Sequence, residues 1–168
     1  MGDVPAANAY VELNFRPNVS LVSVVRRFVS EFYQRTLSDP DGTSRVALAT
    51  HELLENAVKY SKDGETTIRI EVSTQTPRIV SIQLRNRADP AHIAAIREIV
   101  DGVSSAPDAF MYYQELITRK ARKKEEGSGL GLARICAEGE MKVALRVTDG
   151  DMVTLEATTH VGVTGGAA

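Results

Sequence analysis

The sequence predicts an α+β two-layer sandwich in which a mixed, mainly antiparallel sheet carries its helices on one face. Two adjacent pairs of segments have strand character, and a short turn joins the members of each pair. Segments with apolar residues at helical spacing separate these pairs. Turn-linked strands pair antiparallel, and amphipathic helices need one apolar surface to cover. With 168 residues, 43% of them hydrophobic, the chain is expected to form a single domain over residues 1–168.

The first half of the chain supplies two helices and three strands in this prediction. Residues 9–15 (AYVELNF) alternate as a strand does, and residues 18–37 repeat apolar side chains at helical spacing. A second helix is expected to begin at Thr43 or Ser44, which are good N-cap residues, and to end near SKDG at 61–64. Two strands at 65–74 and 78–85 then form a hairpin.

The second half is predicted to contain three helices, one loop and two strands. Pro90 opens a helix that reaches residue 102, and residues 108–120 are also helical. Residues 119–128 (RKARKKEEGS) have no apolar face and are expected to form a loop before a short helix at 130–139. Two strands within 140–159 meet at an Asp-Gly-Asp turn, and residues 160–168 are expected to be a short flexible tail.

Composition narrows the classes of function. A formal net charge of −2 gives no overall basic field, so we expect no direct nucleic-acid partner. No stretch approaches the ~20 apolar residues of a membrane span, so no membrane partner is expected. The single cysteine, Cys136, fits a reducing compartment and a small buried position on a helix. We therefore expect a cytoplasmic protein.

Glu52 and Asn56 lie four residues apart on the second predicted helix and so share one face of it. A carboxamide oxygen is a suitable ligand for Mg²⁺, and a neighbouring carboxylate can accept a proton from a hydroxyl that attacks a phosphate. The same spacing is also typical of ordinary surface residues on an amphipathic helix. Glu55 is assigned to a structural ion pair with Lys59, and His51 to the polar surface.

Gly127, Ser128, Gly129, Leu130, Gly131 and Leu132 form a glycine-rich turn that runs into a helix. Glycines let backbone N–H groups approach an anion, and the start of a helix points its free donors at the same place. The turn therefore has the properties of a phosphate site. It is not a P-loop, because no Gly-Lys-Ser/Thr follows, and it is not a dinucleotide fingerprint, because it does not follow a first strand.

ELLEN (52–56) on an early helix and GSGLGL (127–132) before a late helix together resemble the histidine-kinase-like (GHKL) ATPase superfamily, whose fold is the Bergerat ATP-binding fold. The resemblance is greatest to the stand-alone anti-sigma-factor serine/threonine kinases. It implies ATP and Mg²⁺ as cofactors, Asn56 as the magnesium ligand and Glu52 as the catalytic base.

The resemblance also implies the remaining site residues and the partners. Residues 127–132 would surround the phosphates, Lys59 would contribute to nucleotide binding, and residues 102–126 would form an ATP lid. Lys120, Arg122, Lys123 and Lys124 in that lid would face phosphate or a partner, unless they are simply solvated. The expected partners are a STAS-like antagonist protein and a sigma factor or other effector, and homodimers are common in the family.

Asn86 and Ala88 depart from the family pattern. The family has an aspartate and glycines after the central hairpin, and the aspartate binds the adenine amino group. This chain has LRNRADP at 84–90, so Asn86 stands at the aspartate and Ala88 at the first glycine. An amide oxygen still accepts that hydrogen bond, but the loss of charge costs about 1 kcal/mol of adenine recognition.

Two functions therefore stay open. The first is a Mg·ATP-dependent protein serine/threonine kinase of the anti-sigma-factor type, which phosphorylates and binds a small regulatory protein. The second is a degenerate GHKL domain that binds proteins and has little or no affinity for ATP. A coupled ATPase would need further domains, and a sensor histidine kinase would need a helical hairpin before the Glu52–Asn56 segment.

Overall fold

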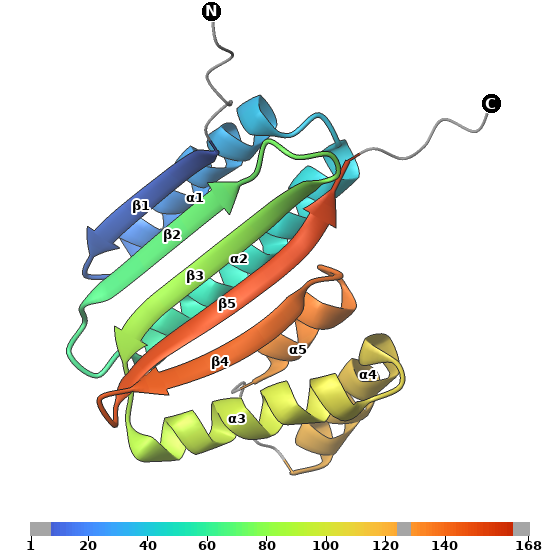
Figure 1. The fold of residues 1–168 in the computed structure, drawn as a ribbon. Helices are drawn as coiled ribbons and strands as arrows, with labels where there is room; N and C mark the ends of the chain where they lie inside the picture. The colour runs from blue at the N-terminus through green and yellow to red at the C-terminus, as the bar shows by residue number, and fades with distance from the viewer. Residues whose placement is uncertain (1–7, 124–128, 163–168) are drawn as a thin grey trace, which may run out of the picture.

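The computed structural model describes residues 8–123 and 129–162. One five-stranded sheet carries the described helices on one side (Figure 1). The strands are β1 (Ala9–Phe15), β2 (Thr66–Val72), β3 (Arg78–Arg87), β4 (Lys142–Thr148) and β5 (Met152–Val161), and the helices are α1 (Val19–Thr36), α2 (Pro40–Tyr60), α3 (Pro90–Ser105), α4 (Ala109–Lys123) and α5 (Leu130–Ala137).

The sheet has the order β1-β2-β3-β5-β4, and every pair of neighbouring strands in it is antiparallel. The α+β fold class is confirmed, although the described sheet is antiparallel throughout rather than mixed. Both predicted hairpins are present, β2 with β3 and β4 with β5. Strands β1 and β4 are the two edges of the sheet. The candidate site described below lies on the helix side of the sheet, from its central strands toward β4.

Alternation along the strands separates a buried face from a polar one. In β2, Ile68, Ile70 and Val72 are buried, whereas Arg69 and Glu71 point to the other face and form an ion pair. The buried face packs against α1, α2 and α5, which lie behind the sheet in Figure 1. The two layers of the sandwich thus enclose a single core.

The helix α2 crosses the middle of this core and begins earlier than the sequence predicted. Asp39, not Thr43 or Ser44, is the N-cap: its carboxylate accepts a hydrogen bond from the N–H of Asp41 at 3.0 Å, and Pro40 takes the first helical position. The Asp-Gly pair that resembles a turn lies within the helix because Gly42 packs against Val161 at the end of β5. A tertiary contact therefore decides this boundary.

Two further predictions about chain segments were wrong in part. Residues 119–123 are the last turn of α4 rather than a loop, and residues 124–128 lie outside the described residues. Arg and Lys have high helix propensity, and cations are stabilised near a helix C-terminus, so this turn needs no apolar face of its own. Residues 160 and 161 belong to β5 rather than to a tail, because they pair with β3.

Candidate nucleotide site

Glu52 lies at the junction between α2 and α5. The next two residues, Leu53 and Leu54, are fully buried in the core, and this orients the Glu52 side of α2 toward α5. Only 14% of the Glu52 side chain is exposed. A Cβ added to Gly131 would lie 2.5 Å from Glu52 Oε2, so the carboxylate occupies space that only a glycine leaves open. The structure thus brings Glu52 to the first turn of α5.

Arg134, in the next turn of α5, binds the other oxygen of this carboxylate. Its Nη1 donates to Glu52 Oε1 at 3.0 Å, and its Nε donates to Glu138 Oε2 at 2.7 Å. Both hydrogen bonds raise the pKa of Arg134, with the bond to Glu138 the larger cause, so the guanidinium stays charged. No sequence pattern singled out Arg134, which the structure places at the candidate site.

Tyr113 of α4 faces the same cluster of charges. Partial burial raises the pKa of its hydroxyl, and the nearby carboxylate of Glu138 raises it further, while Arg134 opposes the shift. Glu52, Tyr113 and Arg134 therefore come from three different helices. The end of α4 that holds Tyr113 is fixed beside the site.

Asn56 follows Glu52 by one helical turn. Its Nδ2 is buried and has no hydrogen-bond partner among the described residues. A buried amide donor without a partner is costly, so this side chain has hydrogen-bonding capacity that the described protein does not use. No cluster of three or more His, Cys, Asp or Glu side chains in the described part of the chain could hold a metal. The unpartnered Nδ2 is a donor suited to a phosphate oxygen, whereas a magnesium ion would be held by the amide oxygen of Asn56, and that role stays a prediction.

The described part of the glycine turn has the geometry of a helix start. Gly129 is the N-cap of α5, with φ 94°, and a Cβ there would lie 2.8 Å from Ile99 Cγ1 of α3. Ala133 N–H donates to Gly129 O, so the N–H groups of Leu130, Gly131 and Leu132 have no partner within the helix. Among the described residues none accepts from these three groups, and a helix start of this kind suits an anion. Gly127 and Ser128 lie outside the described residues.

The predicted adenine end lies where β2 and β3 meet. Asn86 is buried on the helix-facing side of β3, directly opposite Thr66 of β2. Thr66 is also buried, and its Oγ1 has no hydrogen-bond partner among the described residues. The Thr66 hydroxyl and the Asn86 amide therefore lie side by side as two polar groups within the otherwise apolar buried face of the sheet. Thr66 was not singled out from the sequence, because a threonine in a strand is ordinary there.

Ala88 is fully buried and makes a backbone hydrogen bond. Its N–H donates to Asp151 O at 3.0 Å, which ties the end of β3 to the β4–β5 turn. In the position where the resemblance places a glycine, this residue is fixed by packing and by the hydrogen bond. Its N–H is engaged with Asp151 and is not free for a ligand.

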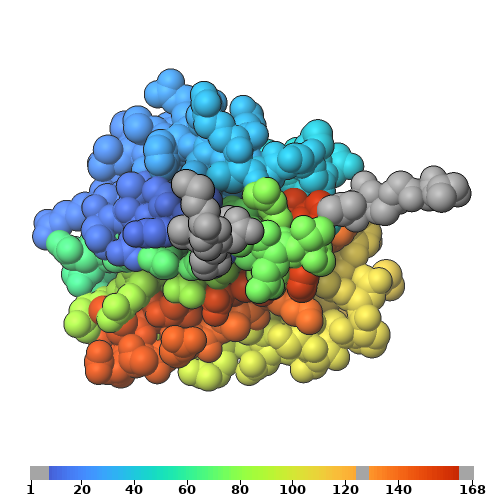
Figure 2. All heavy atoms as spheres, turned by 45° about the horizontal axis from the view of Figure 1, so that its top comes forward, coloured from blue at the N-terminus to red at the C-terminus, as the bar shows by residue number. Residues whose placement is uncertain are grey.

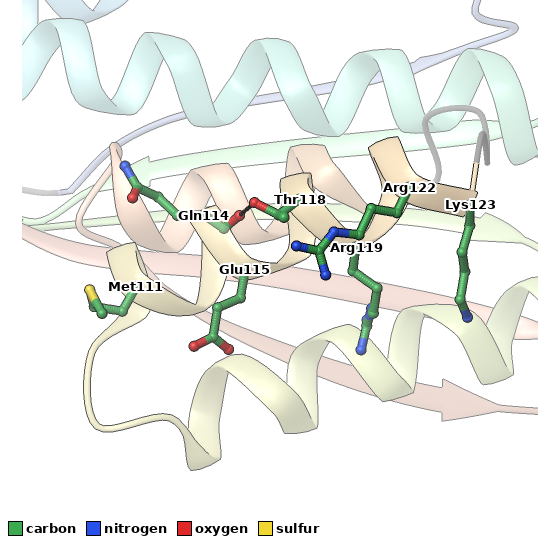
Figure 3. A pocket seen from close by; sticks show the side chains of 7 residues that line it. All are labelled: Met111, Gln114, Glu115, Thr118, Arg119, Arg122 and Lys123. Atoms are coloured by element: carbon green, nitrogen blue, oxygen red, sulfur yellow. Dashed lines mark hydrogen bonds between the residues drawn. The ribbon is translucent and has the colours of Figure 1, made fainter.

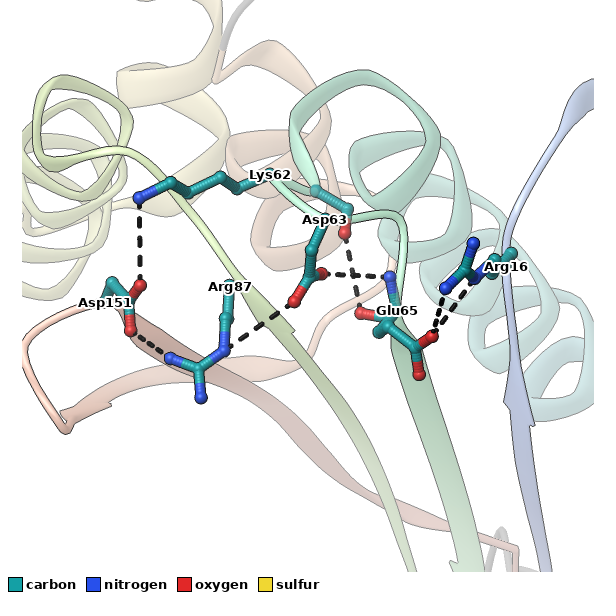
Figure 4. Close-up of polar contacts among 7 residues, drawn as sticks. Arg16, Lys62, Asp63, Glu65, Arg87 and Asp151 are labelled. Carbon is teal, nitrogen blue, oxygen red and sulfur yellow. Dashed lines mark hydrogen bonds and ion pairs between the residues drawn. The ribbon is translucent and has the colours of Figure 1, made fainter.

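Charged side chains surround the outer end of this region (Figure 4). Arg87 pairs with Asp151 and, at 3.6 Å, with Asp63, while Lys62 lies 3.9 Å from Asp151. The N–H of Lys62 donates to Arg87 O at 2.8 Å, so the end of α2 is joined to the end of β3. A small cavity of about 140 Å³ is lined there by Thr66, Asn86, Asp63, Arg87 and other residues.

Two aromatic rings lie beside the same strand end. Tyr60, the last residue of α2, and His92, in the first turn of α3, stack with ring centroids 3.9 Å apart and planes at 18°. Burial lowers the pKa of His92, and the nearby carboxylate of Asp89 only partly opposes this shift. This stacking of the His92 imidazole on the Tyr60 ring links the end of α2 to the start of α3.

Three polar residues of α2 lie away from Glu52. Glu55 pairs with Lys59 at 4.0 Å, in agreement with its structural assignment, and 55% of the Lys59 side chain is exposed. Nucleotide binding by Lys59 stays a prediction. His51 is not a simple surface residue: it lies 3.5 Å from Glu55, 24% of its side chain is exposed, and its Nδ1 is buried without a partner among the described residues.

The predicted lid is mainly helical where the structure describes it. It consists of the end of α3, a short connection at 106–108, and α4. Glu115, Arg119 and Lys123 point from α4 toward α3 and line a groove of about 510 Å³ (Figure 3). Arg119 lies 3.9 Å from Glu98 of α3. Arg122 is exposed and Lys120 half-buried, while Lys124 lies outside the described residues.

Residues 15–156 match the sequence model of the histidine kinase-like ATPase domain. The chain belongs to the histidine kinase-like ATPase family. Membership of this family supports nucleotide binding as the general property of the domain. No curated protein matches the sequence.

Among solved structures, a chain of the SiaB–SiaC complex from Pseudomonas aeruginosa has a similar fold. The TM-score is 0.65 at 12% sequence identity, and the match covers 90% of this chain and 89% of that chain. At this identity the likeness concerns the fold. No described helix is both long enough and apolar enough to cross a membrane.

Proposed function

We propose that this histidine kinase-like ATPase domain is a Mg·ATP-dependent protein serine/threonine kinase of the anti-sigma-factor type. The observation that carries the proposal is the position of Glu52, whose carboxylate lies against Gly131 at the free N–H groups of α5. Glu52 is the base that accepts the proton of an attacking hydroxyl. Helix α5 holds phosphate at its first turn, and Asn56 holds the magnesium ion.

ATP supplies the phosphoryl group in this proposal, and the protein supplies position and charge. Asn86 and Thr66 would hold the base end, at the buried polar position between β2 and β3. The acceptor would be a serine or threonine of a small regulatory protein such as a STAS-like antagonist, with a sigma factor or other effector as a second partner. The fold it shares with a chain of a two-protein complex supports a protein partner.

A degenerate, protein-binding domain is the second candidate. It is favoured by Ala88, which is buried and hydrogen-bonded to Asp151 where a ligand would have to approach closely. Calorimetric titration of Mg·ATP into wild type, Asn56→Ala and Asn86→Asp separates the two candidates. The kinase proposal expects binding by wild type, weakening of about tenfold or more in Asn56→Ala, and tighter binding in Asn86→Asp. No binding by wild type with tight binding by Asn86→Asp would establish a decayed site.

Phosphoryl transfer itself is tested with γ-³²P-labelled ATP and purified STAS-domain proteins from the same organism. Acid-stable label on a serine or threonine is expected with wild type and is expected to be lost in Glu52→Gln. Label that is acid-labile, or that persists in Glu52→Gln, would contradict the proposed chemistry.

A homodimer formed through α1 completes the proposal. Leu21, Val24 and Phe28 lie on one side of α1 and are each between 41% and 52% exposed. Helix α1 lies behind the edge strand β1 (Figure 1), and the apolar residues of β1 are only half-buried. Figure 2 shows α1 and α4 at opposite sides of the molecule, so a second copy bound at α1 would leave α4 accessible.

A further inference from the structure

The guanidinium of Arg134, in the second turn of α5, is linked to the first turn of that helix through Glu52. Glu52 lies between them: one carboxylate oxygen accepts from Arg134 Nη1 at 3.0 Å, and the other is 2.5 Å from the position of a Gly131 Cβ. A single carboxylate therefore bridges the guanidinium and Gly131, whose N–H is one of the three that have no partner within the helix. A positive side chain and the positive end of the helix thus flank the same carboxylate.

The guanidinium is held in place and still has donors to offer. Arginine carries five N–H donors in a rigid plane. Nε donates to Glu138 at 2.7 Å and Nη1 to Glu52, while Nη2 donates no hydrogen bond to the described residues. The Arg134 side chain is 40% exposed. Two carboxylates thus fix the plane, and its remaining edge is accessible.

Electrostatics decides what this edge would bind. Alone at the first turn, the Glu52 carboxylate would repel a phosphate, since two like charges at short distance disfavour each other. Arg134 neutralises that carboxylate and adds donors suited to a phosphate group, which arginine binds in a planar, often bidentate manner. In the proposed function the phosphate beside Glu52 is the terminal one, because Glu52 acts on the hydroxyl that attacks it.

We propose that Arg134 is the residue by which this site distinguishes a nucleoside triphosphate from a diphosphate. Its Nη2 edge binds the terminal phosphate while Nε and Nη1 keep their carboxylate partners. This inference rests on the proposed nucleotide site and adds a specificity-determining residue to it.

The test is calorimetric titration of Mg·ATP and, separately, Mg·ADP into wild type, Arg134→Gln and Arg134→Lys. Arg134→Gln is expected to weaken Mg·ATP binding by about tenfold or more and to change Mg·ADP binding by less than about twofold. Arg134→Lys keeps the charge but loses the planar donor pair, so an intermediate loss is expected. Arg146→Gln, on the outer face of the sheet, is the matched control and should change neither affinity.

Equal weakening of both nucleotides in Arg134→Gln, or no change in either, would overturn the inference and leave the nucleotide site intact. Failure of wild type to bind either nucleotide would instead overturn the proposed function, and this inference with it. If Arg134→Gln does not fold, as judged by circular dichroism, Glu52→Gln provides the second measurement. Removal of the negative charge should raise the ratio of ATP to ADP affinity severalfold, and an unchanged ratio would overturn the inference.

Discussion

At the scale of single residues, buried polar side chains differ in whether they have a hydrogen-bond partner. In the core, the hydroxyls of Tyr33 and Thr50 bind each other at 2.9 Å, and burial raises the pKa of Tyr33. In the site, Asn56 Nδ2 and Thr66 Oγ1 are buried without such a partner among the described residues. Unsatisfied buried groups cost free energy in the protein alone, so these two side chains are suited to a bound ligand.

Cys136 gives a prediction at the same scale. Partial burial raises the pKa of its thiol to about 11, although a hydrogen bond with the backbone of Val143 opposes the shift. The thiolate is the reactive form, so at pH 8 the folded protein should react with iodoacetamide about a hundredfold more slowly than the unfolded protein. Mass spectrometry of alkylated Cys136, with and without denaturant, measures this ratio. Equal rates in the two states would contradict the burial of the thiol.

Single elements are held in place by their ends as much as by their apolar faces. Helix α2 is capped by Asp39, which lies close to Gly42 near the end of β5, and just after its last turn the N–H of Lys62 donates to Arg87 O. The position of Glu52 and Asn56 along the pocket depends on both ends. Changes at the N-cap should therefore alter the stability of the helix that carries the site.

Asp39 gives a pH-dependent prediction for this element. Hydrogen bonds from the backbone, that of Gly42 foremost, lower the pKa of its carboxyl in the folded protein. Asp39→Ala should lower the melting temperature by about 2 to 4 °C at pH 7, and Asp39→Asn, which keeps a capping oxygen, by less.

The sign of the pH effect follows from the lowered pKa. A group with a lower pKa in the folded state stabilises the protein above its unfolded pKa and loses this effect as the pH falls through the folded pKa. The difference in melting temperature between wild type and Asp39→Ala should accordingly shrink as the pH falls below about 4. A difference that stays constant from pH 7 to pH 2 would rule out the ionised carboxylate as its source.

In the whole molecule, α1 lies toward the β1 edge of the antiparallel sheet and α4 lies toward its β4 edge (Figure 1). The site lies between α2 and α5, on the helix side of the sheet, and α4 covers its outer part with basic and aromatic residues. Helix α1 lies on the far side of the molecule from α4 (Figure 2). The proposed dimer contact and the proposed nucleotide site are therefore separate surfaces.

This separation gives a prediction about assembly. Phe28 on α1 and Phe110 on α4 are exposed to nearly the same extent, at 48% and 49%. Light scattering coupled to gel filtration should show a dimer for wild type and for Phe110→Glu, but a monomer for Phe28→Glu, because a buried charge opposes the apolar contact. Nucleotide binding should be unchanged in Phe28→Glu. A monomeric wild type, or dissociation by both substitutions, would contradict the α1 contact.

Much of the fold and part of the site followed from local pattern. Strand alternation, helical spacing and the Asp-Gly turn predicted the order of elements and both hairpins, because side-chain period and turn chemistry act within a few residues. The same reasoning selected Glu52, Asn56 and the glycine turn. A carboxylate and an amide four residues apart share a helix face wherever the helix lies.

Long-range packing decided the rest. Gly42 is helical because it meets Val161, residues 119–123 extend a helix that Leu116 and Tyr113 anchor, and Thr66 faces Asn86 through the register of β2 with β3. Arg134 is 82 residues from Glu52 in the chain. The sequence around it does not distinguish it from the other lysines and arginines, of which the chain has 20 with Arg134 included. Local sequence patterns thus set which helices and strands form and which of them carry the polar residues of the candidate site. Which of these side chains meet depends on packing in three dimensions, because contacts between distant segments form only when all the elements pack together.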